Sequence, residues 1–379
     1  MSTRDSKILG MLGGGQLGRF FVVAAQKLGY RVFVLDPDKK SPAGLVADQH
    51  ICKNFDDYDA LDNIIENCFA VTTEFENIPS TTLAYLEKSI TVHPSSFAVS
   101  IAQNRIKEKN FLQDNNFPVG PFKVIEKKDH IDQVPHNFFP AILKVAQFGY
   151  DGKGQKMVTN IEELNQAFVQ LNFVPCVLEK KLSLDIEISV VMGRSLNSNS
   201  VCLPLAENQH KNGILDITIS PARVSENIAS KAREYAQAIA EKLDYVGVLA
   251  VEFFIVDNTL YINEIAPRPH NSGHYSLDAC NLNQFDLQVR TLTDLELLDP
   301  EPHTKSVMVN LLGDIWFANK DKLREPNFNI LLNEANVRLH FYGKEEPRRG
   351  RKMAHFNVLG DDLNNILDKA KKLKKLLMN

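Results

Sequence analysis

The chain has 379 residues, and at roughly 150 residues per domain this length predicts two or three domains with ordinary hydrophobic cores. Its composition is 44% hydrophobic and 24% charged with 19 Gly and 17 Pro, which excludes collagen, a coiled coil and bulk disorder. A net charge of -4 provides no overall attraction to nucleic acid or to an anionic membrane. Any anion-binding site must therefore be local.

Five cysteines are scattered along the chain without a C-x-x-C pair, which is typical of free thiols in a reducing compartment. The first seven residues are polar and charged, and no run of about 18 apolar residues occurs. We therefore expect a cytoplasmic protein that neither crosses nor binds a membrane.

The N-terminal segment alternates between strand and helix patterns, as an α/β domain does. The acids Glu74 and Glu76 directly follow one of its apolar strands. Ligands of open parallel sheets bind at the carboxyl ends of the strands, so these acids are candidates for a site. The expected elements are a strand at 7–12, a tight turn at 13–18, a helix at 17–28 and strands at 31–35 and 68–73.

The turn at 13–18 has the sequence GGGQLG, which fits G-x-G-x-x-G, and Asp36 follows about 20 residues later at the end of a strand. This pattern is typical of dinucleotide-binding enzymes and by itself suggests NAD. The glycines guarantee only close backbone approach and exposed amides, which suit any phosphate or carboxylate. A tight turn without a ligand is the other interpretation.

A charged helix at 105–115 and the turn-rich stretch at 117–121 mark a domain boundary. Short strands dominate beyond it, interrupted by one helix at 228–243. After Pro300 a smaller section ends in an amphipathic helix whose lysines we expect to face solvent. The strands expected between are 141–145, 177–180, 186–192, 247–256 and 260–265.

The loop FGYDGKGQ at 148–155 has three glycines in six residues, and Lys144 precedes it at the end of a predicted strand. Glycine-rich backbone can wrap phosphates while Lys144 and Lys153 provide positive charge. The loop is not a Walker A motif, because no G-K-[ST] follows four spacer residues. A hairpin turn with solvent-exposed lysines fits these residues equally well.

Glu252 and Glu264 lie on two apolar strands that form a hairpin across 257–258. A three-residue loop would place the carboxylates directly opposite each other, and a two-residue loop would make them diagonal neighbours. Like charges this close need neutralisation, which a magnesium ion would provide where phosphates also bind. A salt bridge to an Arg or Lys from elsewhere is the alternative.

The segment APRPHNSGH begins two residues after Glu264 and contains Arg268, His270, Asn271 and His274. Its two prolines restrict the backbone, so a guanidinium, an imidazole and an amide are held beside the proposed metal. These groups suit a small oxyanion.

A second local cluster of charge lies in the sequence YGKEEPRRGRKMAH. Phosphate recognition and an exposed turn explain its composition equally well. Its cations are Lys344, Arg348, Arg349, Arg351 and Lys352.

Together these motifs resemble a known family over residues 7–358. The features similar to the ATP-grasp superfamily are Lys144, GYDGKGQ, EKKL at 179–182, Glu187 and the Glu252–Glu264 pair. More narrowly, GGGQLGR, TTEFENIP, NEIAPRPHNSGH and GKEEPRRGRKMAH resemble the N5-carboxyaminoimidazole ribonucleotide synthetases, ATP-dependent carboxylases of purine biosynthesis. Ala266 stands where common ATP-grasp enzymes have an Asn, as it does in this subfamily.

The resemblance implies a mixed α/β and α+β architecture with an ATP-grasp fold. An N-terminal Rossmann-like domain of the biotin-carboxylase type would occupy residues 1–105. The ATP-grasp domain would occupy 106–300, with two lobes joined near 179–182, and a small C-terminal domain would occupy 301–379.

The resemblance also implies a role for each site residue. ATP would contact Arg105 and Lys144 with its phosphates, under a closing loop of Gly149, Tyr150, Asp151, Gly152, Lys153, Gly154 and Gln155. Its nucleoside would lie against Glu179, Lys180, Lys181, Leu182, Glu187, His210 and Asn263, and magnesium would bind Glu252 and Glu264. Bicarbonate and its phosphorylated form would contact Arg268, His270 and Asn271. The ribonucleotide would contact Gln16, Glu76, Tyr150, Lys153, Lys344, Arg351 and Lys352. Lys153 stands where many relatives have Arg, so a bidentate contact is lost there.

The implied reaction is ATP- and bicarbonate-dependent carboxylation of 5-aminoimidazole ribonucleotide through carboxyphosphate. We expect a cytoplasmic homodimer whose partners are small molecules, with no nucleic acid and no membrane. Three alternatives remain at this point. They are another ATP-grasp ligase such as formate-dependent glycinamide ribonucleotide transformylase, an NAD-binding oxidoreductase, and a non-catalytic nucleotide-binding regulator.

Overall fold

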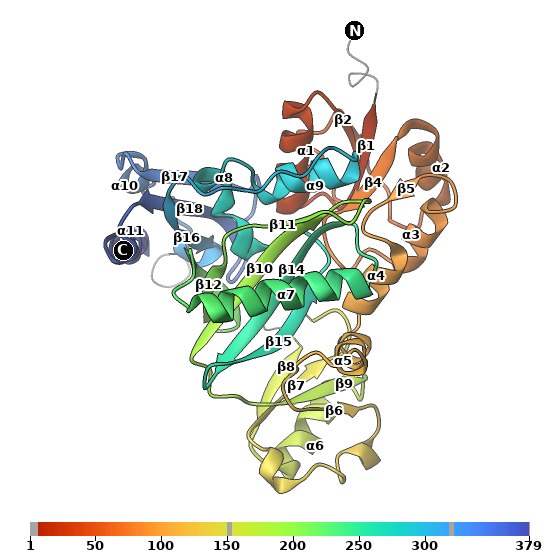
Figure 1. The fold of residues 1–379 in the computed structure, drawn as a ribbon, viewed down its shortest axis with the longest axis vertical. Helices are drawn as coiled ribbons and strands as arrows, with labels where there is room; N and C mark the ends of the chain where they lie inside the picture. Colours follow the sequence, from red (N-terminus) through yellow and green to blue (C-terminus); the bar gives the residue numbers. More distant parts are fainter. Residues whose placement is uncertain (1–6, 150–153, 318–321, 379) are drawn as a thin grey trace.

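The computed structural model describes residues 7–149, 154–317 and 322–378, which form three packed β-sheets with surrounding helices (Figure 1). The predicted residues Tyr150, Asp151, Gly152 and Lys153 therefore lie outside the described part of the chain. None of the helices in the described residues is long and apolar enough to cross a membrane.

The N-terminal sheet has five parallel strands in the order β3-β2-β1-β4-β5. Apolar residues of α1 pack on one face and those of α2 and α3 on the other, as the alternating pattern predicts. The strand predicted from 68 begins at Ala70, because the Cys68 amide still donates to the Ile64 carbonyl at the end of α2. The elements are β1 (Ile8–Leu12), α1 (Gln16–Lys27), β2 (Arg31–Leu35), β3 (Gln49–Ile51), α2 (Tyr58–Asn67), β4 (Ala70–Thr73), α3 (Ser80–Leu86) and β5 (Thr91–Val92).

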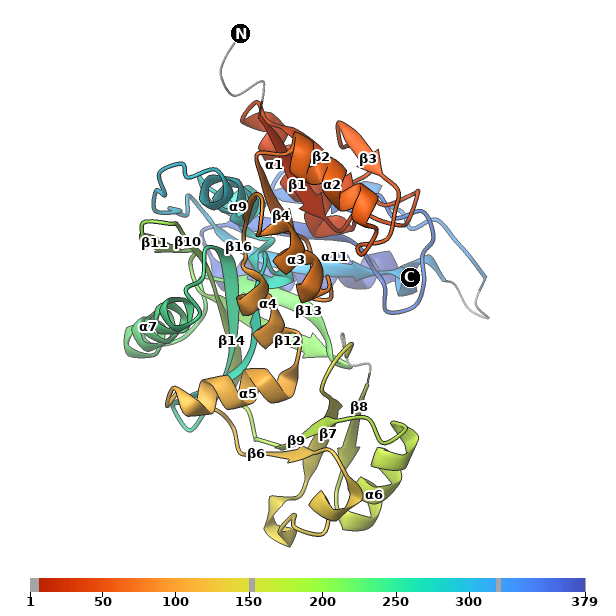
Figure 2. The ribbon, with the colours of Figure 1, turned by 90° about the vertical axis from the view of Figure 1, so that its right-hand side faces the viewer.

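Two further helices connect this sheet to the centre of the molecule. Sequence patterns missed α4 (Ser96–Ala102), which begins where the Ser95 hydroxyl accepts the Ala98 amide hydrogen. The predicted charged helix is α5 (Arg105–Asp114), and the Asn104 side chain accepts its first amide hydrogens. Figure 2 shows α5 between the large sheet and the small one.

The small sheet is antiparallel, with strand order β6-β9-β7-β8, and α6 packs on one face of it. It lies at one end of the molecule, as seen in yellow at the bottom of Figure 1. Its elements are β6 (Phe122–Ile125), β7 (Ala141–Val145), β8 (Gln155–Val158), α6 (Ile161–Gln170) and β9 (Cys176–Lys180), with short 3-10 turns at Lys128–His130 and His136–Phe138.

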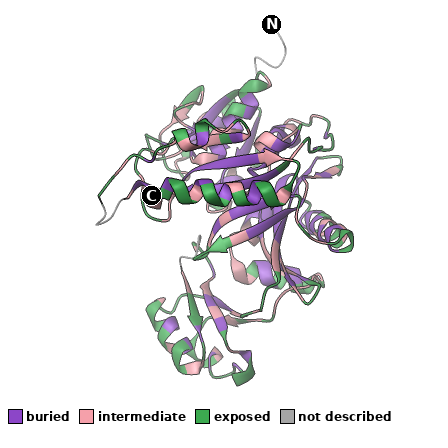
Figure 3. Cartoon of the chain, turned by 90° about the vertical axis from the view of Figure 1, so that its left-hand side faces the viewer, coloured by how far each residue is buried: buried purple, intermediate pink, exposed green. Residues whose placement is uncertain are grey.

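The large sheet has nine strands in the order β15-β14-β10-β12-β13-β16-β18-β17, with β11 paired to β10. Its long central strands are largely buried (Figure 3). Pairing of β13 with β16 continues the sheet from the central section into the C-terminal section. Because one sheet spans both sections, the domain boundaries at residues 105 and 300 stay a prediction from the sequence.

The elements of this half follow in chain order. They are β10 (Ile186–Arg194), β11 (Ser200–Cys202), β12 (Ala206–Lys211), β13 (Ile214–Ser220), α7 (Glu226–Lys242), β14 (Gly247–Val256), β15 (Thr259–Ala266), α8 (Ser276–Ala279), α9 (Gln284–Leu292), β16 (Lys305–Leu312), α10 (Asn329–Leu332), β17 (Val337–Phe341), β18 (Lys352–Gly360) and α11 (Leu363–Met378), with 3-10 turns at Asn271–Gly273 and Gly313–Trp316.

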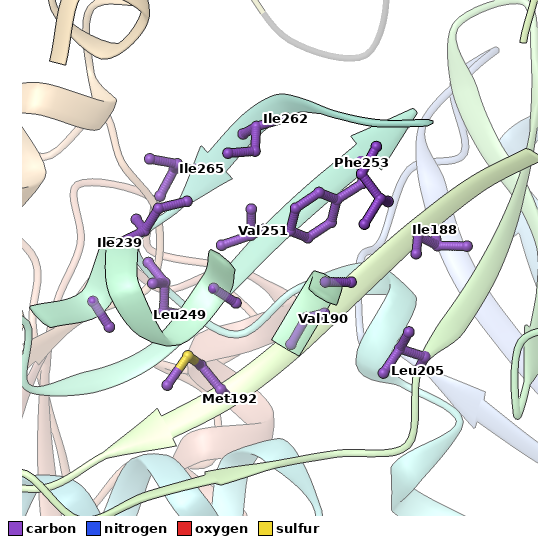
Figure 4. Packing of buried hydrophobic residues seen from close by; sticks show 14 of the residues in the cluster. Ile188, Val190, Met192, Leu205, Ile239, Leu249, Val251, Phe253, Ile262 and Ile265 are labelled. Carbon is purple, nitrogen blue, oxygen red and sulfur yellow. The ribbon is translucent and has the colours of Figure 1, made fainter. Parts of the chain in front are cut away.

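The core beneath α7 determines which side chains face the site. Val251 and Phe253 of β14 pack with Ile239 of α7 (Figure 4). Side chains alternate between the two faces of a strand, so Glu252 must face the opposite side of the sheet. Burial of the apolar face thus orients the acidic residue toward the site.

Candidate active site

The β14–β15 hairpin brings Glu252 and Glu264 directly opposite each other. Its loop is the two-residue form, Asp257 and Asn258, both with positive φ. By loop length alone Glu252 would face Asn263. A β-bulge at this point inserts one residue into β15 and restores the direct pairing. The carboxylates therefore converge as expected, by a route that the loop length did not indicate.

The two carboxylates are held in different electrostatic environments. Burial and the neighbouring Glu264 both raise the pKa of Glu252. Burial opposes ionisation of Glu264 as well, but Arg105, whose guanidinium lies 2.9 Å from Glu264 Oε2, outweighs it and lowers that pKa. Arg105 thus provides the salt bridge considered as the alternative, but for one carboxylate of the pair only.

The donor set at this pair fits a hard divalent cation. Both side chains provide oxygen ligands, and the Asn263 amide nitrogen lies 3.4 Å from Glu252 Oε2 with its own buried Oδ1 unpartnered. Magnesium prefers a few carboxylates plus phosphate and water oxygens. In the described residues no group of three or more His, Cys, Asp and Glu side chains comes together as a metal cluster.

Lys144 and Glu179 form a partly buried ion pair on neighbouring strands of the small sheet. The Lys144 ammonium donates to Glu179 Oε2 at 2.6 Å, and Lys109 Nζ lies 3.5 Å from Glu179 Oε1. Burial opposes ionisation of Glu179, but these two lysines outweigh it and lower its pKa to about 2. The small sheet therefore holds an ionised carboxylate beside a lysine, and the positive charge of Lys144 also helps to lower the pKa of Glu264 on the large sheet.

Glu187 and His210 form a matching pair on the large sheet, on adjacent strands β10 and β12. His210 Nδ1 lies 2.5 Å from Glu187 Oε2. Burial disfavours the imidazolium, but the hydrogen bond to Glu187 and the charge of Glu252 raise the pKa of His210 above its usual value. Of the predicted nucleoside residues, Glu179, Glu187 and His210 are thus each part of an acid–base pair.

The remaining predicted nucleotide residues line the small lobe through their backbone. The Lys180 and Lys181 amides donate to the Pro121 and Pro140 carbonyls at 2.9 Å, which anchors the segment that leads to Leu182. The Gly154 carbonyl accepts the Val145 amide hydrogen at 2.9 Å. Gln155 pairs with Lys144, and Gly149 is the last described residue before the gap.

The loop after β15 presents Arg268 and His270 between the domains. Arg268 Nε donates to Glu76 Oε2 of the N-terminal domain at 2.5 Å. His270 Nε2 lies 3.4 Å from Glu252 Oε1. Burial, Arg268 and Lys352 lower the pKa of His270 to about 3, so its ring is neutral at physiological pH.

A chain of hydroxyls fixes the tautomer of His270. Asn208 donates to the Ser189 hydroxyl, which donates to Ser272 Oγ at 2.6 Å. Ser272 Oγ lies 2.8 Å from His270 Nδ1, and the Ser272 amide also donates to this nitrogen. Because Nδ1 accepts, the neutral ring holds its proton on Nε2, which faces Glu252.

The side chain of Asn271 belongs to a buried amide pair. Its side chain and that of Asn310 on β16 each donate to the other's oxygen, at 3.1 and 2.5 Å. The Asn310 amide also donates to the Leu215 carbonyl. The structure therefore gives Asn271 a well-defined orientation.

The basic segment at 344–352 is folded against the N-terminal domain. Lys344 Nζ donates to Gln16 Oε1 at 2.7 Å and to the Lys352 carbonyl at 2.8 Å. The Arg351 guanidinium donates to the Glu346 carbonyl at 2.9 Å. The predicted ribonucleotide residues of the two terminal domains are thus brought side by side.

Side chains of the protein itself occupy several backbone amides of the glycine-rich turn at 13–18. The Gly14 amide donates to Asp36 Oδ2 at 2.7 Å, and the Gly15 and Leu17 amides donate to the buried Glu74 carboxylate. A side chain at Gly15 would collide with this carboxylate, which explains the glycine. The protein itself thus occupies the position that a pyrophosphate would take, which argues against the NAD interpretation.

Sequence reasoning missed two charged residues in the site, Glu108 and Lys109. Both are 2% exposed, and both contact β15 from α5. The available signal was spacing, because Arg105, Glu108 and Lys109 are three and four residues apart and so share one face of a helix. Burial of that charged face could not be read from the sequence.

Comparison with known families gives a consistent match along the chain. Residues 6–103 match the ribonucleotide synthetase preATP-grasp domain, 110–285 match the ATP-grasp domain, and 306–369 match the phosphoribosylaminoimidazole carboxylase C-terminal domain. The N5-carboxyaminoimidazole ribonucleotide synthase of Bacillus subtilis (strain 168) is 40% identical over 354 residues, which cover 93% of this chain and 91% of that protein.

Solved structures agree with this match. The N5-carboxyaminoimidazole synthetase of Staphylococcus aureus, complexed with ADP, aligns with a TM-score of 0.89 at 37% identity over 97% of this chain and 96% of that one. The Aspergillus clavatus N5-carboxyaminoimidazole synthase, in complex with ADP and 5-aminoimidazole ribonucleotide, aligns with a TM-score of 0.89 at 28% identity over 99% of both chains. The identity of 40% over 93% of the chain and the three matching domain families show that the chain belongs to the N5-carboxyaminoimidazole ribonucleotide synthetase family, and its central section matches the ATP-grasp domain.

Proposed function

We propose that this protein uses ATP and bicarbonate to carboxylate 5-aminoimidazole ribonucleotide, giving N5-carboxyaminoimidazole ribonucleotide. The observation that carries the proposal is the convergence of Glu252, Glu264, Arg105 and His270 between the nucleotide lobes and the ribonucleotide residues. Relatives named for this activity, with ADP and aminoimidazole ribonucleotide complexes among them, support it.

The nucleotide would bind between the small and large sheets. Lys144 would leave Glu179, and Arg105 would leave Glu264, to contact phosphate oxygens of the nucleotide. Charge-assisted hydrogen bonds to phosphate are strong and would replace these ion pairs. Glu187 has two carboxylate oxygens for the ribose hydroxyls. Magnesium held by Glu252 and Glu264 would neutralise charge on the phosphoryl group during transfer.

The phosphoryl acceptor would be a bicarbonate oxygen, and the product carboxyphosphate would release carbon dioxide beside the amine of the ribonucleotide. The neutral His270 ring would donate a hydrogen bond from Nε2 to a negatively charged oxygen of bicarbonate or carboxyphosphate, and Arg268 would provide positive charge. Asn271 would have to release its amide pair with Asn310 before its side chain could contact the oxyanion. The amine then attacks carbon dioxide, and its proton leaves to solvent or phosphate.

The predicted lid residues Tyr150 and Lys153 complete the proposal, with Lys153 contributing charge to the transferred group. A closed lid is needed because carboxyphosphate hydrolyses readily in water. We also propose a cytoplasmic homodimer, the location being supported by five free cysteines, three of them buried. Light scattering tests the dimer.

Release of ADP from the purified protein tests the reaction. ATP turnover should require both aminoimidazole ribonucleotide and bicarbonate. Replacement of this pair by glycinamide ribonucleotide and formate should give only background. Turnover with formate and glycinamide ribonucleotide would instead favour the formate-dependent ligase and would overturn the proposal.

Lys352→Ala should raise KM for the ribonucleotide by more than tenfold and change KM for ATP little. Lys352 begins β18 beside the Lys344–Gln16 contact, where we place the substrate phosphate. One charge-assisted contact is worth roughly 1.5 to 3 kcal/mol, which corresponds to this change. Steady-state kinetics with each substrate varied measures it, with Lys375→Ala on the exposed face of α11 as the control. Equal changes in both KM values would reject the assignment.

A further inference from the structure

The bulge in β15 decides the geometry of the glutamate pair. Pairing of Val256 with Thr259 and of Phe253 with Ile262 continues in regular register up to this point. One extra residue, Asn263, then intervenes before Glu252 pairs with Glu264. Without the bulge, the side chain opposite Glu252 would be that of Asn263, and Glu264 would not face it directly.

β15 is the edge strand of the large sheet, and among the described residues only an isolated bridge between Val119 and Ile262 pairs with its outer side. The segment that contains α5 satisfies backbone groups of β15 at the bulge. Lys109 Nζ donates to the Asn263 carbonyl at 2.7 Å, and Glu108 Oε1 accepts the Ile265 amide hydrogen at 2.5 Å. The Ile262 amide donates to the Pro118 carbonyl at 2.7 Å. Each side of the inserted residue is therefore held by a specific polar contact.

Glu108 and Lys109 both contact the backbone of β15, and Lys109 Nζ also lies 3.5 Å from Glu179 Oε1. Glu108 and Lys109 are each only 2% exposed, so neither presents a surface to a substrate. Burial of a charged group costs free energy unless the group is paired, and both side chains form hydrogen bonds with the backbone of β15. Arg105, on the same face of α5, contacts Glu264 itself. One helix face thus contacts Asn263, Glu264 and Ile265 in succession.

We propose that Glu108 and Lys109 are positioning residues that hold the bulge at Asn263, place Glu264 opposite Glu252 and so set the affinity of this pair for a divalent cation. This inference rests on the metal assignment in the proposed function. A bulge that is fixed from outside the sheet keeps the two carboxylates in register when Arg105 moves from Glu264 to phosphate. Loss of such supporting contacts at metal sites typically costs roughly 10–100-fold in metal affinity or activity.

The test uses Glu108→Leu and Glu108→Gln in the full chain. Magnesium is titrated at a fixed ADP concentration, and the half-saturating magnesium concentration is read from the rise in Tm. The Tm increment that ADP produces in the presence of EDTA reports nucleotide binding without metal. Glu108→Leu should raise half-saturation about tenfold or more while the Tm increment from ADP with EDTA stays unchanged. Glu108→Gln retains an acceptor oxygen and should restore most of the affinity. A lower Tm with unchanged half-saturation would show a merely structural role and overturn the inference.

Lys109→Met provides a second variant that does not depend on the folding of Glu108→Leu. It should also weaken magnesium, whereas Lys107→Met, on the exposed side of the same helix, should leave half-saturation unchanged. Equal half-saturation in the two methionine variants would contradict the inference. Glu264→Gln is the reference variant. If Glu264→Gln leaves the magnesium dependence of Tm unchanged, the metal assignment fails. If Glu264→Gln abolishes that dependence while the Glu108 and Lys109 variants keep the half-saturation of the unmodified protein, only the positioning role is rejected.

Discussion

Glu264→Gln is expected to lower turnover by at least ~100-fold while the protein remains folded. The substitution removes one of the two opposed carboxylates that we assign to magnesium, and electrostatic stabilisation of this kind is worth that much in rate. ADP release at saturating ATP, bicarbonate and ribonucleotide measures the loss. Normal turnover at ordinary magnesium concentrations would contradict the metal assignment.

Glu252→Gln is the matched control, because it should abolish turnover equally but change stability differently. In the metal-free protein, burial and Glu264 raise the pKa of Glu252 above its value in the unfolded chain. As pH rises from the unfolded-state pKa toward the raised folded-state pKa, ionisation of Glu252 therefore destabilises the fold increasingly. The gain in Tm from Glu252→Gln should therefore grow between acidic and alkaline pH. Arg105 lowers the pKa of Glu264, so Glu264→Gln should show no such gain at alkaline pH. Thermal unfolding of both variants in EDTA measures the difference.

His270→Asn should lower carboxylation by about 100-fold or more and leave ATP-dependent thermal stabilisation nearly intact. In the described part of the chain, the neutral ring offers its Nε2 proton beside Glu252 and its Nδ1 contacts Ser272, neither of which we assign to the nucleoside. Loss of a positioned hydrogen-bonding or proton-transfer group has this scale of effect. Tm with and without ATP, together with product formation, gives both readouts.

Two other outcomes for His270→Asn are informative. Disappearance of ATP stabilisation along with activity would mean that His270 supports the nucleotide site or the fold, and its bicarbonate role would be withdrawn. Continued bicarbonate-dependent ADP release with reduced carboxylation would place its action after carboxyphosphate formation. The second result would amend the order of steps and keep the residue in the site.

The architecture was largely predictable because local patterns determine it. Apolar periodicity predicted β1, α1 and β2 to within about a residue at each end, and the glycine-rich turn between them was correctly placed. The short helix α4 was missed, because its seven residues give too little periodic signal to distinguish a helix from a loop.

The site was only partly predictable because its geometry depends on contacts between distant segments. Sequence placed Glu252 and Glu264 on one hairpin, but a two-residue loop alone would have separated them. The bulge that pairs them is held by Glu108 and Lys109, more than 150 residues earlier in the chain. The hydrogen bond between the Gly15 amide and the Glu74 carboxylate could not be predicted from the sequence either, because the folded sheet is needed to bring the two residues together.

Isotope transfer from bicarbonate tests the central claim most directly. The reaction is run with ATP, aminoimidazole ribonucleotide and bicarbonate labelled with oxygen-18, and the inorganic phosphate is analysed by mass spectrometry. If a bicarbonate oxygen attacks the γ-phosphoryl group, the phosphate released should contain one labelled oxygen for each carboxylated product. Unlabelled phosphate formed at the same rate as carboxylated product would contradict phosphoryl transfer to bicarbonate and with it the proposed mechanism.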